Sequence, residues 1–273
     1  MIKLKKMKGI QRTEEHRIDL HAFLARRSKV LSIYVPAGYP EIDSLPYVLR
    51  ILEESGVDMV EIGIPYSDPL ADGPVIQACH TRALANGMTL RLLFDQLASV
   101  QTRIPLLLMG YFNVMLQFGV ERFCKSCVDH GVSGVIIPDL PIDEYVIAYQ
   151  QIFIKHRLNC VFMITPQTSD QRIRHIDSVS TGFIYAVSSA STTGTGRSQL
   201  SQEYLRRLHD MQLLNPVLTG FNITDNAAFS QATTYTRGAI IGSAFLQHLS
   251  TSEDLTRDIP SFIANIKGND HTA

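Results

Sequence analysis

Short runs of apolar residues recur along the chain, separated by longer segments in which apolar and polar residues mix with helical spacing. The runs are continuous rather than alternating, which is typical of parallel strands covered by helices. They follow one another about every 20–35 residues, with one longer gap after the second, and this is the spacing of strand–helix units. The expected strands are 30–35, 58–64, 105–109, 134–137, 159–164, 182–187, 216–219 and 238–241.

The intervening segments predict helices, several of which end at a glycine such as Gly56 or Gly131. Eight strand–helix units favour an α/β fold, a (β/α)₈ TIM barrel with an extra helix before the first strand. A doubly wound open sheet shares this pattern, but no Gly-rich dinucleotide turn follows the first strand. The expected helices are 13–27, 42–54, 75–85, 89–100, 119–130, 143–156, 170–179, 201–212, 224–230, 242–248 and 252–266.

Composition places the chain among single-domain cytoplasmic proteins. Residues 1–273 are expected to form one barrel domain, with a basic tail over 1–12 and a flexible tail over 268–273. A net charge of −1 gives no reason to expect a nucleic-acid partner. Four irregularly spaced cysteines do not make a secreted disulfide framework, and no apolar run is long enough to span a membrane.

The stretch 60–77, V-E-I-G-I-P-Y-S-D-P-L-A-D-G-P-V-I-Q, carries the strongest chemical signal. Glu61 lies within an apolar strand, and burial favours the neutral form of a carboxyl group and raises its pKa. Asp68 and Asp72 follow on a proline-rich loop at the carboxyl end of that strand. Two structural alternatives stay open: Glu61 as a buried acid paired to an arginine or a backbone donor, and the aspartates as loop caps.

Active sites of such barrels lie at the carboxyl ends of the strands, and phosphate often binds after strands seven and eight. Here those positions are 220–222 and Gly242-Ser243, the second of which opens a short helix. The loop 188–197 adds Thr193 and Gly194 as amide donors or as a lid, and Tyr185 is placed to face the strand-two carboxylate or to fill the core.

Other chemistries lack their residues. No lysine lies at the carboxyl end of an expected strand, where a Schiff-base aldolase would need one. Cys124, Cys127 and His130 share one helix without a fourth ligand, so ordinary packing is favoured over zinc. What remains is acid–base chemistry by carboxylates on a phosphorylated substrate.

The stretch 61–77 closely resembles the signature of the tryptophan synthase alpha subunit, and the resemblance extends from V-P-A-G-Y-P at 35–40 through P-D-L-P at 138–141 to G-S-A at 242–244. It implies a (β/α)₈ barrel that cleaves indole-3-glycerol phosphate to indole and glyceraldehyde 3-phosphate without a cofactor of its own. It also implies a beta subunit partner, which uses pyridoxal phosphate and receives the indole in an α₂β₂ heterotetramer.

The resemblance assigns roles to individual residues. Glu61 matches the general acid–base, Asp72 the carboxylate that binds the indole N–H, and Tyr185 the tyrosine beside the glutamate. The remaining matches are to substrate and partner contacts: Thr193 and Gly194 in the lid, Phe221, Asn222, Gly242 and Ser243 at the substrate and its phosphate, and Asp68 and Pro69 at the beta subunit.

Two places depart from the family pattern. The lid reads Ser191-Thr192-Thr193-Gly194 where the family usually has Gly-Val-Thr-Gly, and Asn222 replaces a common glycine. These departures motivate a second hypothesis, a non-catalytic subunit that only activates its beta partner. A third is a phosphate-binding barrel isomerase that acts on a phosphoribosyl substrate and releases no indole.

Overall fold

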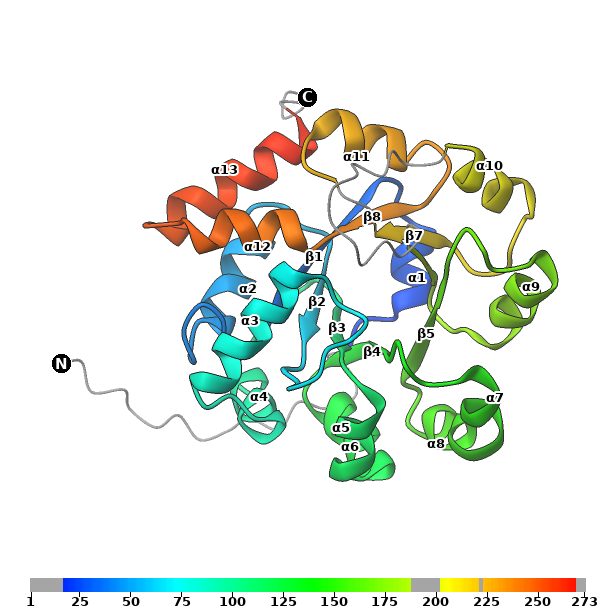
Figure 1. Ribbon diagram of the computed structural model, residues 1–273, viewed down its shortest axis with the longest axis horizontal. Coiled ribbons are helices and arrows are strands. Elements are labelled where there is room, and N and C mark those ends of the chain that lie inside the picture. The colour runs from blue at the N-terminus through cyan, green and yellow to red at the C-terminus, as the bar shows by residue number, and fades with distance from the viewer. Residues whose placement is uncertain (1–16, 188–201, 221–222, 269–273) are drawn as a thin grey trace.

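The computed structural model describes residues 17–187, 202–220 and 223–268. In these residues eight parallel strands close into a barrel, each paired with the next and the last with the first, and helices surround them (Figure 1). The (β/α)₈ fold class is therefore confirmed. The strands are β1 (Val30–Pro36), β2 (Met59–Gly63), β3 (Leu106–Met109), β4 (Val132–Ile136), β5 (Asn159–Ile164), β6 (Ile184–Val187), β7 (Val217–Gly220) and β8 (Gly238–Ile241).

Most helices begin and end within a few residues of the sequence expectation. They are α1 (Leu20–Ala25), α2 (Leu45–Glu54), α3 (Pro74–Ala85), α4 (Leu90–Leu97), α5 (Phe112–Phe118), α6 (Val120–Asp129), α7 (Ile142–Glu144), the π-helical turn η2 (Tyr145–Tyr149), α8 (Gln150–Lys155), α9 (Asp170–Val179), α10 (Gln202–Asp210), α11 (Asn226–Ala232), α12 (Ser243–Ser250) and α13 (Leu255–Lys267).

Two expectations need correction. Within the described residues, which start at 17, the helix expected over 13–27 begins at Leu20, because Asp19 is extended and its carboxylate caps the helix by accepting from the Ala22 amide at 3.0 Å. The expected connection after the third strand contains a helix, α5, that the pattern did not predict. Gly119, with φ of 90°, separates α5 from α6.

The inside of the barrel is filled by one ring of apolar side chains from or next to all eight strands. The short helix α1 closes the amino-terminal end of the barrel, because Leu20 and Leu24 are fully buried against that ring. Gly182 makes room for Leu20, since a Cβ there would lie 2.7 Å from its Cδ2. The ring consists of Val30, Met59, Leu107, Ile136, Val161, Phe183, Leu218 and Ile240.

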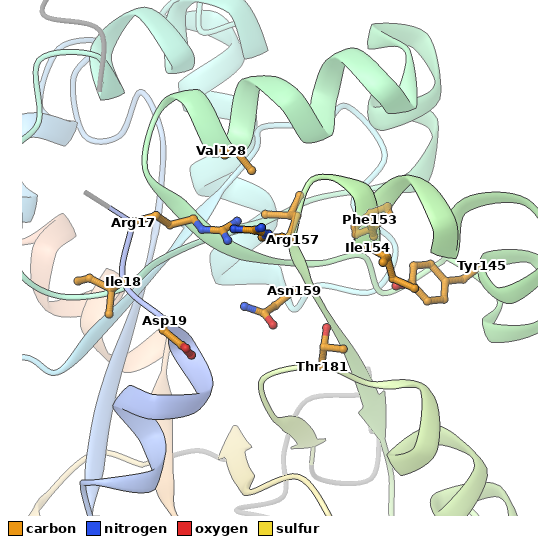
Figure 2. A pocket seen from close by; sticks show the side chains of 11 residues that line it. Arg17, Ile18, Asp19, Val128, Tyr145, Phe153, Ile154, Arg157, Asn159 and Thr181 are labelled. Atoms are coloured by element: carbon orange, nitrogen blue, oxygen red, sulfur yellow. The ribbon is translucent and has the colours of Figure 1, made fainter. Parts of the chain in front are cut away.

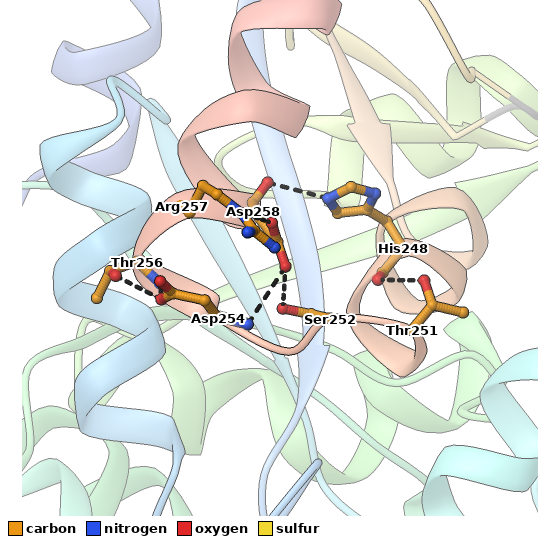
Figure 3. Close-up of polar contacts among 7 residues, drawn as sticks. All are labelled: His248, Thr251, Ser252, Asp254, Thr256, Arg257 and Asp258. Carbon is orange, nitrogen blue, oxygen red and sulfur yellow. Dashed lines mark hydrogen bonds and ion pairs between the residues drawn. The ribbon is translucent and has the colours of Figure 1, made fainter.

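A second, larger core lies between the strands and the outer helices. The last two helices are joined to each other around Asp258, whose carboxylate accepts from Ser252 Oγ at 2.8 Å and pairs with Arg257 (Figure 3). His248 of α12 meets the carbonyl of Asp258 at 2.9 Å. Among the described residues no helix is both long enough and apolar enough to cross a membrane.

Candidate active site

Glu61 lies on the inner face of β2, above the apolar ring, and is fully buried. Its Oε1 accepts a long hydrogen bond of 3.5 Å from Ser32 Oγ on β1, whereas its Oε2 has no partner among the described residues. Burial raises the pKa of Glu61 to about 8, and the Ser32 bond lowers it only in part. The side chain is therefore a neutral acid near pH 7 that has a free oxygen inside the barrel.

Asp72 is held at the mouth of the barrel by the loop that follows β2. Its Oδ2 accepts a 2.7 Å hydrogen bond from the Tyr111 hydroxyl, which in turn accepts from the Ala71 amide at 3.1 Å. Gln77 secures the backbone by donating to the Asp72 carbonyl at 2.8 Å. Burial raises the pKa of Asp72, and the Tyr111 bond opposes that rise.

Tyr185 projects from β6 into the same interior. A Cβ on Gly220, at the end of β7, would lie 2.4 Å from its hydroxyl oxygen, so the tyrosine ring covers that glycine. Burial raises the pKa of Tyr185, and the charges of Glu61 and Asp72 raise it further. The three residues expected to be catalytic thus lie close enough to act on one another electrostatically, and we call the end of the barrel interior around them the chamber.

The helix α12 begins directly after β8 and forms an anion-binding end. Its first internal hydrogen bond runs from the Leu246 amide to the Gly242 carbonyl at 3.0 Å, and no side chain caps its first turn. The amides that precede Leu246 in this turn have no helical acceptor and point out of the helix end. Gly242 and Ser243, both half-buried, supply this end.

A hollow elsewhere in the molecule lacks such chemistry. A cavity of about 440 Å³ lies beside α1 and the start of β5 (Figure 2). It is at the amino ends of the strands, and its polar groups are committed to the fold: Asn159 Nδ2 donates to the Ser133 carbonyl at 2.7 Å, and Thr181 Oγ1 accepts from the Cys160 amide at 2.9 Å.

The paired cysteines of α6 also serve packing. Cys124 and Cys127 are buried, and burial raises the pKa of both thiols, which disfavours the thiolate that a metal needs. His130 directs Nδ1 to the Ser126 carbonyl at 2.7 Å and packs against the Phe94 ring. Within the part of the chain that the structure describes, no cluster of three or more His, Cys, Asp or Glu side chains could hold a metal ion.

Comparison with known proteins identifies the family of this chain. A family model described as the tryptophan synthase alpha chain matches residues 20–270. The tryptophan synthase alpha chain of Flavobacterium johnsoniae is 53% identical over 248 residues, which cover 89% of this chain and 97% of that protein. The chain belongs to the tryptophan synthase alpha chain family.

Solved structures of this family share its architecture. A mutant tryptophan synthase alpha subunit from the hyperthermophile Pyrococcus furiosus superposes with a TM-score of 0.80 at 30% identity, covering 88% of this chain and 98% of that one. The tryptophan synthase complex from the same organism matches with a TM-score of 0.79 at 29% identity, over 88% and 98% of the two chains.

The reaction of a tryptophan synthase alpha chain is the cleavage of indole-3-glycerol phosphate to indole and glyceraldehyde 3-phosphate. This alpha chain is accordingly a carbon–carbon lyase of tryptophan biosynthesis. For this reaction, residues at the carboxyl end of the barrel must give a proton to the indole ring, take a proton from a hydroxyl group and bind a phosphate.

Four of the substrate-contacting residues expected from the sequence cannot be placed. Thr193, Gly194, Phe221 and Asn222 lie outside the described residues of this alpha chain. The flanking residues are described: Val187 ends β6 and Gly220 ends β7, both at the mouth of the barrel.

The loop expected to meet the beta subunit has both exposed and buried side chains. Asp68 is exposed and accepts from Ser67 Oγ at 2.5 Å. Pro69 is buried instead, and its carbonyl accepts from the Asp72 amide at 3.0 Å, so it shapes the loop that carries the carboxylate. The exposed apolar side chain in this alpha chain loop is Leu70, which is 82% exposed.

Sequence reasoning missed the residues that support the carboxylates. Ser32 and Tyr111 contact Glu61 and Asp72 from 29 and 39 residues away. His80 bonds to Tyr34 across 46 residues. The sequence offered a signal for Tyr111, because it follows the apolar run of β3 and so lies at a strand end. For Ser32 and Tyr34 the signal was the alternation along β1, which places both on the face opposite Ile33.

Proposed function

We propose that Glu61 is the acid–base group through which this alpha chain cleaves indole-3-glycerol phosphate. The observation that carries the proposal is a fully buried carboxyl group with one oxygen unpartnered among the described residues and a pKa raised to about 8. Such a group holds a proton near neutral pH and can give it to the indole ring.

The step needs only this one acid. Glu61 gives its proton to C3 of the indole ring, which becomes an indolenine, and the resulting carboxylate takes the proton of the adjacent glycerol hydroxyl. The carbon–carbon bond breaks as its electron pair returns to the ring, and the hydroxyl carbon becomes the aldehyde. The surrounding apolar side chains keep water from competing for the proton.

Asp72 serves the other end of the indole. Its second oxygen, Oδ1, accepts the indole N–H in this proposal, while Tyr111 holds Oδ2 in place. A negative charge there favours the positive charge that the protonated ring develops. Tyr185 lies beside Glu61 and fixes the wall against which the ring packs.

Gly242 and Ser243 bind the phosphate through the amides at the start of α12. Phe221 and Asn222 complete this end of the site, and Thr193 and Gly194 cover it, as the family resemblance implies. The distance between this helix end and the carboxylates is spanned by the glycerol chain of the substrate.

We also propose that this chain works with a tryptophan synthase beta subunit in an α₂β₂ assembly, as the complex from Pyrococcus furiosus suggests by its name. The beta subunit would supply the pyridoxal phosphate, and we expect none in this chain. Asp68 and Leu70 offer it an exposed surface, and the buried Pro69 sets the bend between them and Asp72.

The test is indole release by the Glu61→Gln variant. Glutamine keeps the shape of the side chain but cannot give a proton, so turnover should fall by at least about 10². Glu53→Gln is the matched control, because Glu53 is bonded to Thr102 and Arg103 outside the chamber. Near-parental turnover in Glu61→Gln, with the beta subunit present or absent, would show that another group moves the proton.

A further inference from the structure

A second pair of polar side chains lies in the chamber, and the acid–base scheme does not use it. Tyr34 projects inward from β1 and is 4% exposed, and His80 of α3 is 2% exposed. Tyr34 Oη and His80 Nε2 are 2.9 Å apart. Two buried polar groups from separate elements are held together here, next to Glu61 on the neighbouring strand.

The direction of this hydrogen bond is fixed by the other ring nitrogen. His80 Nδ1 accepts the backbone N–H of Tyr66 at 3.1 Å, so it carries no proton. The proton of the neutral ring is therefore on Nε2, which donates to Tyr34. Burial lowers the pKa of His80 to about 4, so the ring stays neutral at physiological pH. Tyr34 Oη is an acceptor in this pair and has its own proton left to donate.

The hydroxyl of Tyr34 lies directly over Gly63. A Cβ on Gly63 would be 2.2 Å from Tyr34 Oη. Gly63 follows Glu61 by two residues on β2, so it belongs to the next inward-facing layer, nearer the mouth of the barrel. Among the described residues no acceptor receives the Tyr34 proton. After burial itself, the charges of Asp72, Tyr111, Cys79 and Glu61 raise the pKa of Tyr34, so both carboxylates act on this hydroxyl.

The glycerol chain of the ligand carries two hydroxyl groups, and the one next to the ring is the acceptor that suits Tyr34. The indole nitrogen is a donor, and the ring has no acceptor atom. The phosphate is expected at Gly242, which adjoins the Cβ of Tyr34 rather than its hydroxyl, 3.6 Å from the Cβ that a side chain there would have. The oxygen of the glycerol hydroxyl next to the ring is the acceptor that must also lie within reach of Glu61.

We propose that Tyr34, oriented by His80, donates a hydrogen bond to this hydroxyl oxygen and thereby turns the proton of the hydroxyl toward Glu61. This rests on the proposed function of Glu61 and adds a substrate-contacting residue, Tyr34, and a positioning residue, His80. Tyr34 keeps its proton throughout. When the hydroxyl carbon becomes the aldehyde, the same bond is made to the new carbonyl oxygen.

The experiment compares two ligands that differ only in hydroxyl groups. One is indole-3-glycerol phosphate, followed by its cleavage, and the other is indole carrying a three-carbon chain and a phosphate without hydroxyls, followed as a competitive inhibitor. Tyr34→Phe should lower kcat/KM for the substrate about 10-fold and leave the inhibition constant of the deoxy analogue within about 2-fold. Tyr145→Phe, which removes a hydroxyl from a buried tyrosine packed on Phe153 and Phe162, should change neither value.

A second variant tests the orienting residue. His80→Leu should reduce kcat/KM in the same direction, and adding it to Tyr34→Phe should cost less than the product of the two single losses. An equal loss of affinity for both ligands in Tyr34→Phe would mean that Tyr34 only shapes the pocket and would overturn the proposal, as would no loss for either. The failure of Glu61→Gln to lose turnover is a separate result, because the ligand comparison is made with Glu61 intact.

Discussion

Glu61 stays protonated at neutral pH because it is buried without a positively charged partner among the described residues. Its neighbours on the two adjacent strands are Tyr34 and Leu107, neither of which carries a charge at neutral pH. One weak hydrogen bond from Ser32 is the stabilisation that the carboxylate form receives among the described side chains. Small changes at Ser32 should therefore move the proton equilibrium of Glu61 without touching the substrate.

This gives a pH prediction with a definite sign. Because the scheme starts from protonated Glu61, turnover should fall as the pH rises through about 8. Ser32→Ala removes the bond that lowers this pKa, so the fall should move to higher pH. Ser133→Ala is the control, since Ser133 is equally buried but bonds to the Ile18 carbonyl at the other end of the barrel. A pH profile of kcat/KM measures both, and an unmoved or downward-shifted profile in Ser32→Ala contradicts the assignment.

The two carboxylates could be predicted from the sequence, whereas the residues that hydrogen-bond to them could not. Glu61 and Asp72 stood out because an acid in an apolar strand and an acid on a proline-rich loop are local anomalies. The hydroxyls of Ser32 and Tyr111 reach them, and the ring of His80 reaches Tyr34, only through the packing of separate elements. A single sequence has no signal for pairs that are 29 to 46 residues apart. The burial of Pro69 could not be predicted for the same reason, since burial depends on what the loop folds against.

At the level of elements, the strands were predictable because each is a continuous apolar run with a breaker behind it. The ends of the helices were less predictable. The short α1 depends on a cap by Asp19, and α5 contains Phe112, Val114, Met115 and Leu116 in a segment whose helical period is too brief to detect. The π-helical turn Tyr145–Tyr149 interrupts what the pattern presented as one helix, 143–156.

The short helix α1 contributes buried side chains to the barrel interior. Leu20 is fully buried in the end of the barrel, and Gly182 leaves no slack around it. Leu20→Ala should lower the free energy of unfolding by about 2–5 kcal/mol, because it removes a filled contact at the barrel floor. Leu214→Ala, at a side chain that is 79% exposed, should change it by less than about 0.5 kcal/mol. Urea unfolding followed by circular dichroism measures both, and equal values would mean that α1 does not stabilise the barrel.

In the whole molecule, residues that stabilise the fold and residues of the proposed site lie at opposite ends of the barrel axis. The amino ends of the strands are closed by α1, and the carboxyl ends hold the carboxylates, the tyrosines and the start of α12. The loop after β2 belongs to the second group, and it carries both Asp72 and the exposed Leu70. A partner bound on this loop would therefore contact the segment that carries Asp72, the residue proposed to bind the indole N–H.

A substitution at Leu70 tests this surface. Leu70→Glu should weaken binding to the beta subunit by about 10-fold or more, because it places a charge at an apolar contact, while turnover by the isolated chain should stay near the parental value. Leu214→Glu introduces the same charge into the loop before β7, at the opposite end of the barrel, and should leave binding unchanged. Isothermal titration with the beta subunit gives the affinities, and equal binding by the two variants would place the interface elsewhere.

The pairing of β1 with β8 has a consequence for synthesis on the ribosome. Leu31 and Ile33 have Ala239 and Ile241 as strand neighbours, so the first strand keeps one edge open until more than two hundred further residues have emerged. Until then the ring of apolar side chains that buries α1 is incomplete, and Leu20 and Leu24 stay in contact with water or with a chaperone. The nascent chain therefore cannot close its barrel before β8 has emerged.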